Sequence, residues 1–341
     1  MKAPSLSVRF PARSPGTASR WPAWLVAGAT TALLASACAG AVEEPFRSGL
    51  AERDAAQAEG SSDAPAADPD CDDANPRPSL GPPEPLPAPA SLPAGSYMAE
   101  IQARGVLRAG VGADTLLFGF LNPQSGDVEG FDVEMARLVA DAIFGDPDRL
   151  ELIPVQSAER IDRLQDGTVD IVVKTMTINC ERWGSINFST VYYESGQRLL
   201  VGNDTGVVSI DDVGGERAIC AISGTTSLAR LEAEGVATIE EASWTDCLVA
   251  FQQGRAFGIS TDDTILAGLA AQDPYAEVVG APFSEEPYGI GLPKDHPEFT
   301  RFVNAVLEQA RSDGTWERLY DEWLADVLGK GVAVPNASYR T

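Results

Sequence analysis

Two threonines and an arginine follow a strongly apolar stretch in the middle of the chain. Residues 168–173 read TVDIVV, and Thr175, Thr177 and Arg182 come next, in KTMTINCERW. A hydroxyl group can donate or accept a hydrogen bond, and a guanidinium group can bind both oxygens of a carboxylate at once. A binding site for a small carboxylate is therefore one interpretation. Taken alone, the segment favours the other, that ERW only begins the next helix, with Arg182 on its solvated face.

Two further groups of polar residues follow apolar stretches in the second half of the chain. SGTTS, residues 223–227, opens a helix whose free N–H groups can bind an anion. Simple capping by Ser and Thr is the other interpretation, and both can hold together. STDDTILAG places Asp262 and Asp263 at the end of a strand, where either acid can cap the helix that follows.

A third candidate is the cation in SAERIDRLQDG, which contains Ser157 and Arg160. With Ser157 as N-cap, Arg160 occupies the third helical position, where a capping box favours Glu and the macrodipole disfavours a cation. A local mismatch of this kind indicates a functional role, here an anion pocket at the helix N-terminus, to which Lys174 can add a second cation. The alternative is a surface Arg160 in a weak ion pair with Glu159 or Asp162.

These residues are embedded in a repeated alternation of short apolar runs and amphipathic helices. One set begins at Leu107 and a second follows from about residue 216, which is the pattern of parallel sheets covered by helices. We predict the α/β class: two lobes, joined by extended crossovers near 192–196 and 284–288. Because ligands bind at the carboxyl ends of strands in open α/β sheets, the residues after TVDIVV lie where a site is expected.

The N-terminal third of the chain is of a different kind. Residues 1–37 carry four cations and no acid before a short apolar stretch, as in a secretory signal peptide. LLASAC resembles a lipoprotein processing box with Cys38 as the lipidated residue; ordinary cleavage nearby, with Cys38 lost or free, is the alternative. Residues 38–96 are rich in Ala and Pro and are expected to form a tether, flexible first and then stiffened.

Charge and residue counts exclude several classes of function. A net charge of −25 makes nucleic acid an improbable partner, because phosphate binding needs a basic surface. His296 is the single histidine and no CxxC pair occurs, so zinc binding and Ser/His or Cys/His catalysis are not expected, nor is a cofactor. Four cysteines remain besides Cys38: Cys71, Cys180, Cys220 and Cys247. An even number in an exported chain suggests two disulfides, and the sequence leaves three ways of pairing them open.

Five motifs together resemble one protein family, over about residues 97–328. They are GFDVEMARLVADAI (130–143), TxTxxxxR, SGTTS, a strand ending in TDD, and GTWERLYDEWL. The chain resembles the family 3 extracellular solute-binding proteins, the polar amino-acid receptors of ABC importers. The resemblance implies the type II periplasmic-binding fold, with two three-layer α/β lobes hinged on two crossover strands. Asp132 and Glu134 of the first motif are expected to be structural, at a helix start where negative charge suits the dipole.

The resemblance also implies the domain order and the cellular role. Lobe 1 is expected at 97–192 and again at 287–330, lobe 2 at 193–286, and a tail at 331–341. The protein is expected to be a monomeric, lipid-anchored receptor at the outer face of the cytoplasmic membrane that delivers glutamate or aspartate to an ABC permease. An alternative is a sensor that reports to a membrane signalling partner. Enzymes share this fold, but the candidate residues leave no spare acid/base pair.

For the site, the resemblance assigns residues to three parts of an amino acid. The α-carboxylate is assigned to Arg182, Thr177, Thr225 and Thr226. The α-amino group is assigned to Asp262, Thr175 and Thr177, with Asp263 left as the helix cap. The side-chain carboxylate is assigned to Arg160, Ser157 and Lys174; glutamine receptors carry apolar residues at the corresponding place.

Two departures and the disulfides complete the expectations. Residues 114–117 replace the aromatic that usually lies against the ligand, and the candidates to serve instead are Phe118, Phe120 and Tyr288. Gly112 or a neighbour stands where dicarboxylate receptors carry a second arginine, which leaves glutamate, aspartate and their amides open. We expect the pairs Cys220–Cys247, within one lobe, and Cys71–Cys180, which would staple the tether to the domain; a Cys180–Cys220 bond would hinder closure.

Overall fold

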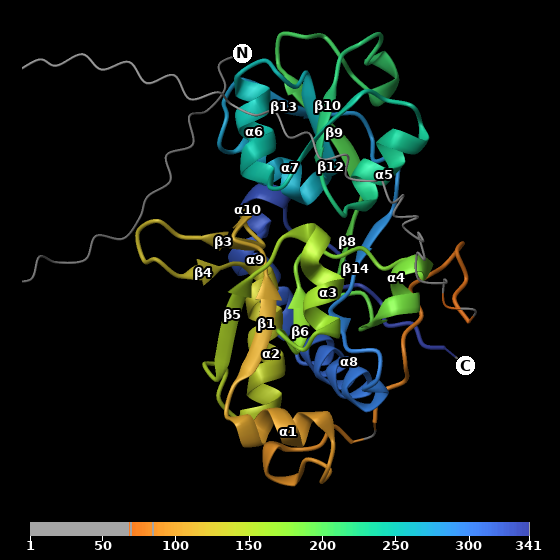
Figure 1. Ribbon diagram of the computed structural model, residues 1–341. Helices are drawn as coiled ribbons and strands as arrows, with labels where there is room; N and C mark the ends of the chain where they lie inside the picture. The colour runs from red at the N-terminus through yellow and green to blue at the C-terminus, as the bar shows by residue number, and fades with distance from the viewer. Residues whose placement is uncertain (1–67, 69, 84, 341) are drawn as a thin grey trace, which may run out of the picture. The chain divides into compact units, whose positions relative to one another are not determined.

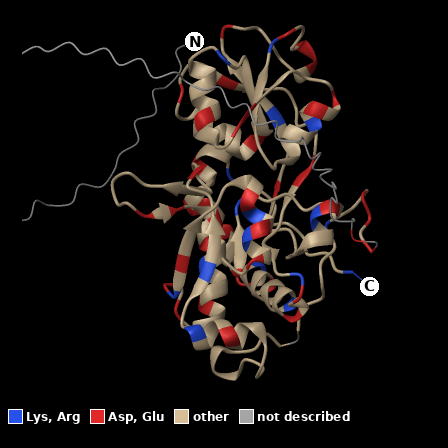
Figure 2. Ribbon diagram, in the orientation of Figure 1, with Lys and Arg blue, Asp and Glu red and all other residues tan. Residues whose placement is uncertain are grey.

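The computed structural model describes residues 68, 70–83 and 85–340 (Figure 1). The expected signal peptide, the lipidation residue Cys38 and the first part of the tether lie outside the described residues. No helix within the described ranges is long and apolar enough to cross a membrane. Acidic residues are spread over the helices of both lobes (Figure 2).

The first lobe is built on a five-stranded sheet with the order β5-β1-β6-β15-β7. Strands β1, β5 and β6 are parallel, and β15 runs antiparallel to β6 and β7. The strands are β1 (Leu107–Val111), β5 (Leu150–Pro154), β6 (Ile171–Val173), β7 (Asn187–Phe188) and β15 (Gly291–Leu292). A short ribbon of β2 (Asp114–Thr115), β3 (Gly119–Leu121) and β4 (Val128–Glu129) follows β1.

Helices cover both faces of this sheet because its strands are apolar on both sides. One core unites strand residues with α1, α2, α8 and α9, and a second core on α3 and α4 contains Leu164, Val172 and Trp183. The helices are α1 (Tyr97–Arg104), α2 (Phe131–Phe144), α3 (Arg160–Gln165), α4 (Cys180–Ser185), α8 (Pro297–Ser312), α9 (Thr315–Trp323) and α10 (Ala325–Leu328).

The second lobe repeats this architecture with the sheet order β11-β10-β12-β9-β13. Its strands are β9 (Gln197–Gly202), β10 (Ile219–Ile222), β11 (Thr238–Glu241), β12 (Gly258–Asp262) and β13 (Ala276–Val279). Helices α6 (Trp244–Gln252) and α7 (Asp263–Ala270) share one core, and α5 (Thr226–Ala233) contributes to another. The disulfide Cys220–Cys247 ties β10 to α6, and its pairing is the expected one.

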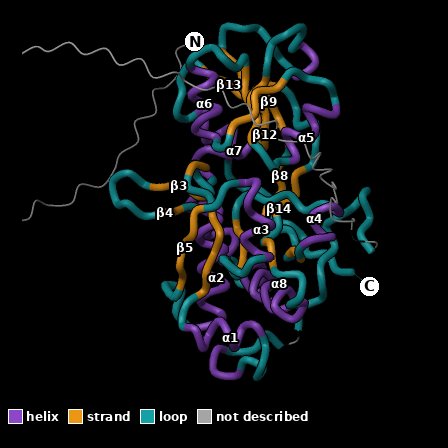
Figure 3. Tube along the Cα trace, viewed as in Figure 1, coloured by secondary structure: helices purple, strands orange, loops and turns teal. Residues whose placement is uncertain are grey.

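Two short antiparallel strands connect the lobes, β8 (Tyr193–Ser195) and β14 (Glu286–Tyr288). They lie between the two sheets in Figures 1 and 3. They coincide with the crossovers expected near 192–196 and 284–288. The predicted two-lobe architecture with two three-layer lobes and two connecting strands is therefore confirmed.

Within the expected tether, the segment 70–83, here called the strap, packs against the first lobe. Cys71 forms the expected disulfide with Cys180, with the two Cα atoms 5.5 Å apart. Ser79 is fully buried and its hydroxyl donates to the Phe188 carbonyl at 2.6 Å. The strap is rich in proline, and some of its carbonyls accept hydrogen bonds from side chains of the lobe. Trp183 Nε1, for example, donates to the Pro76 carbonyl at 3.0 Å.

The strap also contacts the strands that connect the lobes. Arg77 Nε lies 3.1 Å from Glu194 Oε1 on β8, and its Nη2 lies 2.8 Å from Glu285 Oε2, directly before β14. These ion pairs hold the pKa of Arg77 above its usual value. The strap is therefore fixed to one lobe by a disulfide and to both connecting strands by one guanidinium group.

Candidate ligand-binding site

A narrow cavity of about 10 Å³ lies between the carboxyl ends of the central strands of the two lobes. Its twelve lining residues come from the segments after β5 and β6 in the first lobe, and in the second lobe from the end of β12 and the segments after β10, β11 and β12. They are Ser157, Arg160, Thr175, Thr177, Arg182, Thr225, Thr226, Ser227, Trp244, Thr261, Asp262 and Ile265. The structure thus brings together every residue assigned to ligand binding from the sequence, except Lys174.

Thr175 begins the site with an unusual backbone. Its φ is +37°, in the left-handed region that a β-branched residue rarely adopts. Its N–H donates to Asp132 Oδ2 at 2.9 Å, while Tyr192 Oη donates to Asp132 Oδ1 at 2.7 Å. Burial raises the pKa of Asp132 to about 6. Asp132 therefore does more than begin a helix, because it anchors the strained turn that presents the threonines.

Arg182 lies inside the cavity wall rather than on a solvated helix face, so that alternative is wrong. Its helix α4 begins after Asn179, whose side chain accepts from the Arg182 N–H at 2.8 Å. The guanidinium donates to the Thr177 carbonyl at 2.6 Å and, across the cleft, to the Gly224 carbonyl at 3.1 Å. Burial lowers the pKa of Arg182. The second bond joins the two lobes.

Arg160 is likewise buried, and all its hydrogen-bond partners within the described chain are carbonyl oxygens. Its Nε donates to Ser157 at 2.8 Å, its Nη1 to Lys174 at 3.1 Å, and its Nη2 to Gly224 at 2.9 Å. Burial, and then the charge of Arg182, lower the pKa of Arg160 to about 9. Two cationic groups therefore converge on one carbonyl.

The local structure around Arg160 corrects two expectations. The cap is Gln156, which forms a capping box with Glu159 over the 3₁₀ turn Ser157–Glu159; Ser157 is not the N-cap. Glu159 thus occupies the favoured position, and Arg160 is the first residue of α3. The surface ion pair with Arg160 is also wrong, because Glu159 pairs with Arg163 at 3.0 Å. Arg160 therefore does not occupy the capping-box position that singled it out in the sequence. It is nevertheless buried and lines the cavity.

Gly224 is placed where another residue does not fit. Its φ is +72°, and a Cβ added to it would lie 2.5 Å from the Ala158 Cα in the opposite lobe. The Gly224 carbonyl accepts from both arginines, as described above. A glycine is therefore required both for the turn after β10 and for the close approach of the lobes.

The threonines of SGTTS have different partners. Thr225 is the N-cap of α5: its Oγ1 accepts from the Leu228 N–H at 3.2 Å and donates to the Ile222 carbonyl at 2.7 Å. The capping interpretation therefore holds for Thr225, which also lines the cavity. Thr226 Oγ1 instead donates to Glu286 Oε2 at 2.7 Å.

Asp262, at the end of β12, is the acid that faces the cavity. Tyr288 Oη donates to its Oδ2 at 2.6 Å. Burial, and then the charge of Glu286, raise the pKa of Asp262 well above its usual value. Asp263 is not the expected cap, because α7 has no side-chain cap and Asp263 is its first residue. Its Oδ1 accepts from Ser195 Oγ at 2.6 Å instead.

Glu286 and Trp244 are the main residues that the sequence did not reveal. Glu286 is buried on β14 and accepts from Thr177 Oγ1 at 2.6 Å as well as from Thr226. The only signal for it was an acid inside the apolar crossover EPYGIGL. Trp244 is the one aromatic among the lining residues, whereas the candidates Phe118, Phe120 and Tyr288 are not among them. Its position at a helix start after β11, on the edge that carries SGTTS, was the available signal.

Lys174 does not line the cavity. Its Nζ lies 3.6 Å from Asp114 Oδ1, and burial lowers its pKa. Asp114 Oδ2 in turn accepts from the Trp244 N–H at 2.8 Å, across the lobes. Asp114, at the place expected for an aromatic, thus neutralises Lys174 and holds the cavity's tryptophan.

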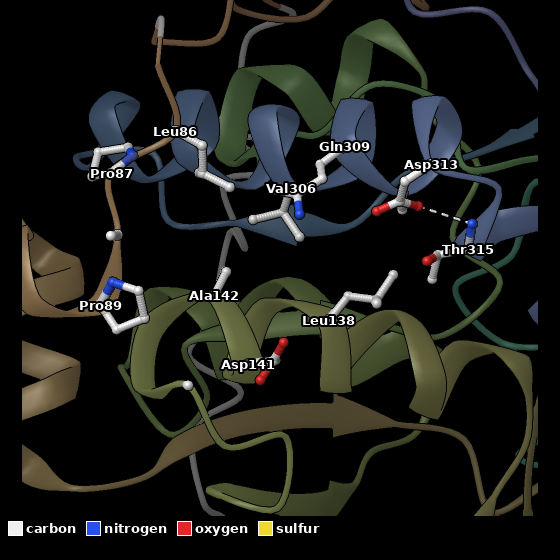
Figure 4. A pocket seen from close by; sticks show the side chains of 13 residues that line it. Leu86, Pro87, Pro89, Leu138, Asp141, Ala142, Val306, Gln309, Asp313 and Thr315 are labelled. Carbon is white, nitrogen blue, oxygen red and sulfur yellow. Dashed lines mark hydrogen bonds between the residues drawn. The ribbon is translucent and has the colours of Figure 1, made fainter.

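A larger hollow on the first lobe has a different character (Figure 4). It lies between α2, α8 and the segment from Leu86 to Pro89, and aliphatic side chains such as Leu138 and Val306 form much of its wall. Its lining includes Asp141 and Asp313 but no cation, and Asp313 accepts from the Thr315 N–H at 2.9 Å. The smaller cavity between the lobes, by contrast, has the converging hydrogen-bond donors and acceptors that a polar ligand needs.

Comparison with known proteins gives the family. The family model of the bacterial extracellular solute-binding proteins, family 3, matches residues 107–326. The chain belongs to this family. It is 35% identical to the ABC transporter glutamine-binding protein GlnH of Bacillus subtilis over 231 residues, 67% of this chain and 85% of the relative. It is 33% identical to the glutamate-binding protein GluB of Corynebacterium glutamicum over 243 residues, 67% of this chain and 82% of the relative.

The solved structures agree. The solute receptor for L-cysteine of Neisseria gonorrhoeae has a TM-score of 0.66 and 25% identity, covering 69% of this chain and 96% of that receptor. The fold is therefore the type II periplasmic-binding fold. The protein is an extracytoplasmic solute receptor of the kind that serves ABC importers, and its relatives are receptors rather than enzymes.

Proposed function

We propose that the protein binds an acidic amino acid, glutamate or aspartate, between its lobes and delivers it to an ABC permease. In this proposal Cys38 carries a lipid anchor that holds the receptor at the outer face of the cytoplasmic membrane. Arg182 binds the α-carboxylate, Asp262 binds the α-ammonium group, and Arg160 with Ser157 binds the side-chain carboxylate.

The observation that carries the proposal is the pair of buried arginines in one small cavity. Arg160 and Arg182 face a single lining carboxylate, Asp262, so the lining residues carry one excess positive charge. Among the described residues both guanidinium groups bond only carbonyl oxygens, which satisfy some N–H groups but do not neutralise the charge. A dicarboxylic amino acid carries one net negative charge and therefore complements this lining.

A second candidate is the neutral amide, glutamine or asparagine. Behind the lining, Asp114 pairs with Lys174 at 3.6 Å and Glu286 adds one more negative charge. With Glu286 counted, the excess positive charge is cancelled, and a neutral zwitterion fits as well. The similarity to a glutamine-binding protein favours the same candidate.

Calorimetric titration separates the two candidates. The mature chain, refolded to remove carried ligand, is titrated with glutamate, aspartate, glutamine, asparagine and arginine. We expect the dicarboxylates to bind more tightly than the amides, and arginine not to bind.

The variant Arg160→Ala tests the side-chain assignment. It should weaken glutamate binding about 10- to 100-fold, because a charged hydrogen-bonding partner is lost, and amide binding much less. Arg163→Ala is the matched control, since Arg163 lies on the same helix in a half-exposed pair with Glu159. Tight binding of the amides alone would contradict the assignment of an acidic ligand. Binding of no amino acid would contradict the proposed function itself.

A further inference from the structure

Glu286 is held by three hydroxyl groups although it does not line the cavity. Its Oε1 accepts from Ser284 Oγ at 2.6 Å, and its Oε2 accepts from Thr177 Oγ1 at 2.6 Å and Thr226 Oγ1 at 2.7 Å. The side chain is buried on β14, which connects the lobes. Short O–H···O bonds of this kind are typical of an ionised carboxylate.

The two threonines come from opposite lobes, and both line the cavity. Each hydroxyl has one proton, and a carboxylate can only accept, so both protons point to Glu286. Their oxygens lie 3.4 Å apart, and neither has a proton left for the other. The remaining lone pairs of Thr177 and Thr226 are therefore available only to a donor.

We propose that Glu286 is a positioning residue that turns the hydroxyls of Thr177 and Thr226 into acceptors for the ligand's α-ammonium group. This inference rests on the proposed function, since it requires an amino-acid ligand. It moves Thr226 from the α-carboxylate to the ammonium group, where it joins Asp262. It also gives the receptor a means of selecting amino acids over the corresponding des-amino acids.

The test uses Glu286→Met with glutamate and with glutarate, which lacks only the amino group. A methionine side chain has a similar size but no carboxylate oxygen, so both threonines lose the acceptor that fixes their protons. Competition calorimetry should show glutamate binding weakened about 10- to 100-fold, and glutarate binding changed less than about threefold. Glu285→Met is the matched control, because its carboxylate is exposed and pairs with Arg77.

A second measurement separates an effect through the threonines from general damage to the fold. In a background of Thr177→Val and Thr226→Val, Glu286→Met should cost less than about a threefold further loss of glutamate affinity, because the groups it acts on are gone. The inference is overturned if glutarate loses as much as glutamate, or if the full loss persists in the valine background. Where glutarate binds too weakly to measure, the valine background decides. A wild-type protein that binds no amino acid would instead overturn the proposed function.

Discussion

Two buried clusters of arginine and carboxylate occur in the first lobe and its cleft, and they differ in how their charges are paired. Around Asp170, which is fully buried, Arg104 and Arg108 both form ion pairs with the carboxylate, and Tyr97 Oη donates to it at 2.9 Å. The backbone N–H of Arg108 adds a bond of 2.8 Å. In the cavity, by contrast, neither arginine has a carboxylate partner among the described residues.

The difference separates a structural cluster from a binding cluster. A buried carboxylate with two cations and two further donors is complete, and removing one member leaves an uncompensated charge. Arginines that bond only carbonyls keep their charge, and their mutual repulsion contributes to the lowered pKa of Arg160. We therefore expect the Asp170 cluster to determine stability and the cavity cluster to determine affinity.

The largest expected effect is that of Arg182→Ala, which tests the cavity side of this comparison. It should weaken binding of every amino acid by more than about 1,000-fold, because the α-carboxylate loses a buried bidentate partner. Stability should change much less, since the lost partners are the Thr177 and Gly224 carbonyls. Calorimetry and urea unfolding measure the two quantities. An Arg182→Ala protein that binds normally would show that its charge is structural.

The second largest effect is that of Asp170→Ala, which tests whether the Asp170 cluster determines stability. It should lower the free energy of unfolding by about 3 kcal/mol, because Arg104 and Arg108 lose their shared partner. Glutamate affinity, measured where the variant is still folded, should stay within about threefold. Asp166→Ala is a control on a nearby exposed acid and should have a small effect. If Arg182→Ala and Asp170→Ala lost equal stability, the distinction between structural and binding charges would not hold.

The sequence allowed the fold and most of the cavity residues to be predicted, because both follow from local patterns. Alternating strands and helices gave two sheets and their crossovers, and the ends of strands gave lining residues such as Thr175, Thr225 and Asp262. The sequence did not reveal the role of Asp170, which comes directly before β6. Its partners Arg104 and Arg108 lie more than 60 positions away in sequence.

Other features escaped prediction for a similar reason. The strap looks like a free spacer by composition, but contacts with residues far away in sequence hold it in place: its disulfide, its hydrogen bonds to the first lobe and the ion pairs of Arg77. Glu286 acquires its role from Thr177 and Thr226, 109 and 60 positions away. The cap at Gln156 shows a local limit, because Ser157 is the better N-cap by residue type and lies one position later.

The smallest effect, of Gly224→Ala, sharpens the comparison by moving the carbonyl that the two cavity arginines share. A Cβ would lie 2.5 Å from the Ala158 Cα, so the lobes must separate for the variant to fit. Glutamate affinity should fall about 10- to 100-fold, as expected for a steric clash of this size. The Asp170 cluster lies outside this contact and should be unaffected.

Gly235→Ala is the matched control for Gly224→Ala. Gly235 has nearly the same backbone, with φ +73° against +72°, but a Cβ there would have no neighbour within 4 Å. Both variants share the strain of a left-handed alanine and should lose similar stability in urea unfolding, by about 1 kcal/mol. Only Gly224→Ala should also lose affinity. Equal affinity in the two variants would mean that the approach of Gly224 to Ala158 is not needed for binding, and that the shared carbonyl does not organise the arginines.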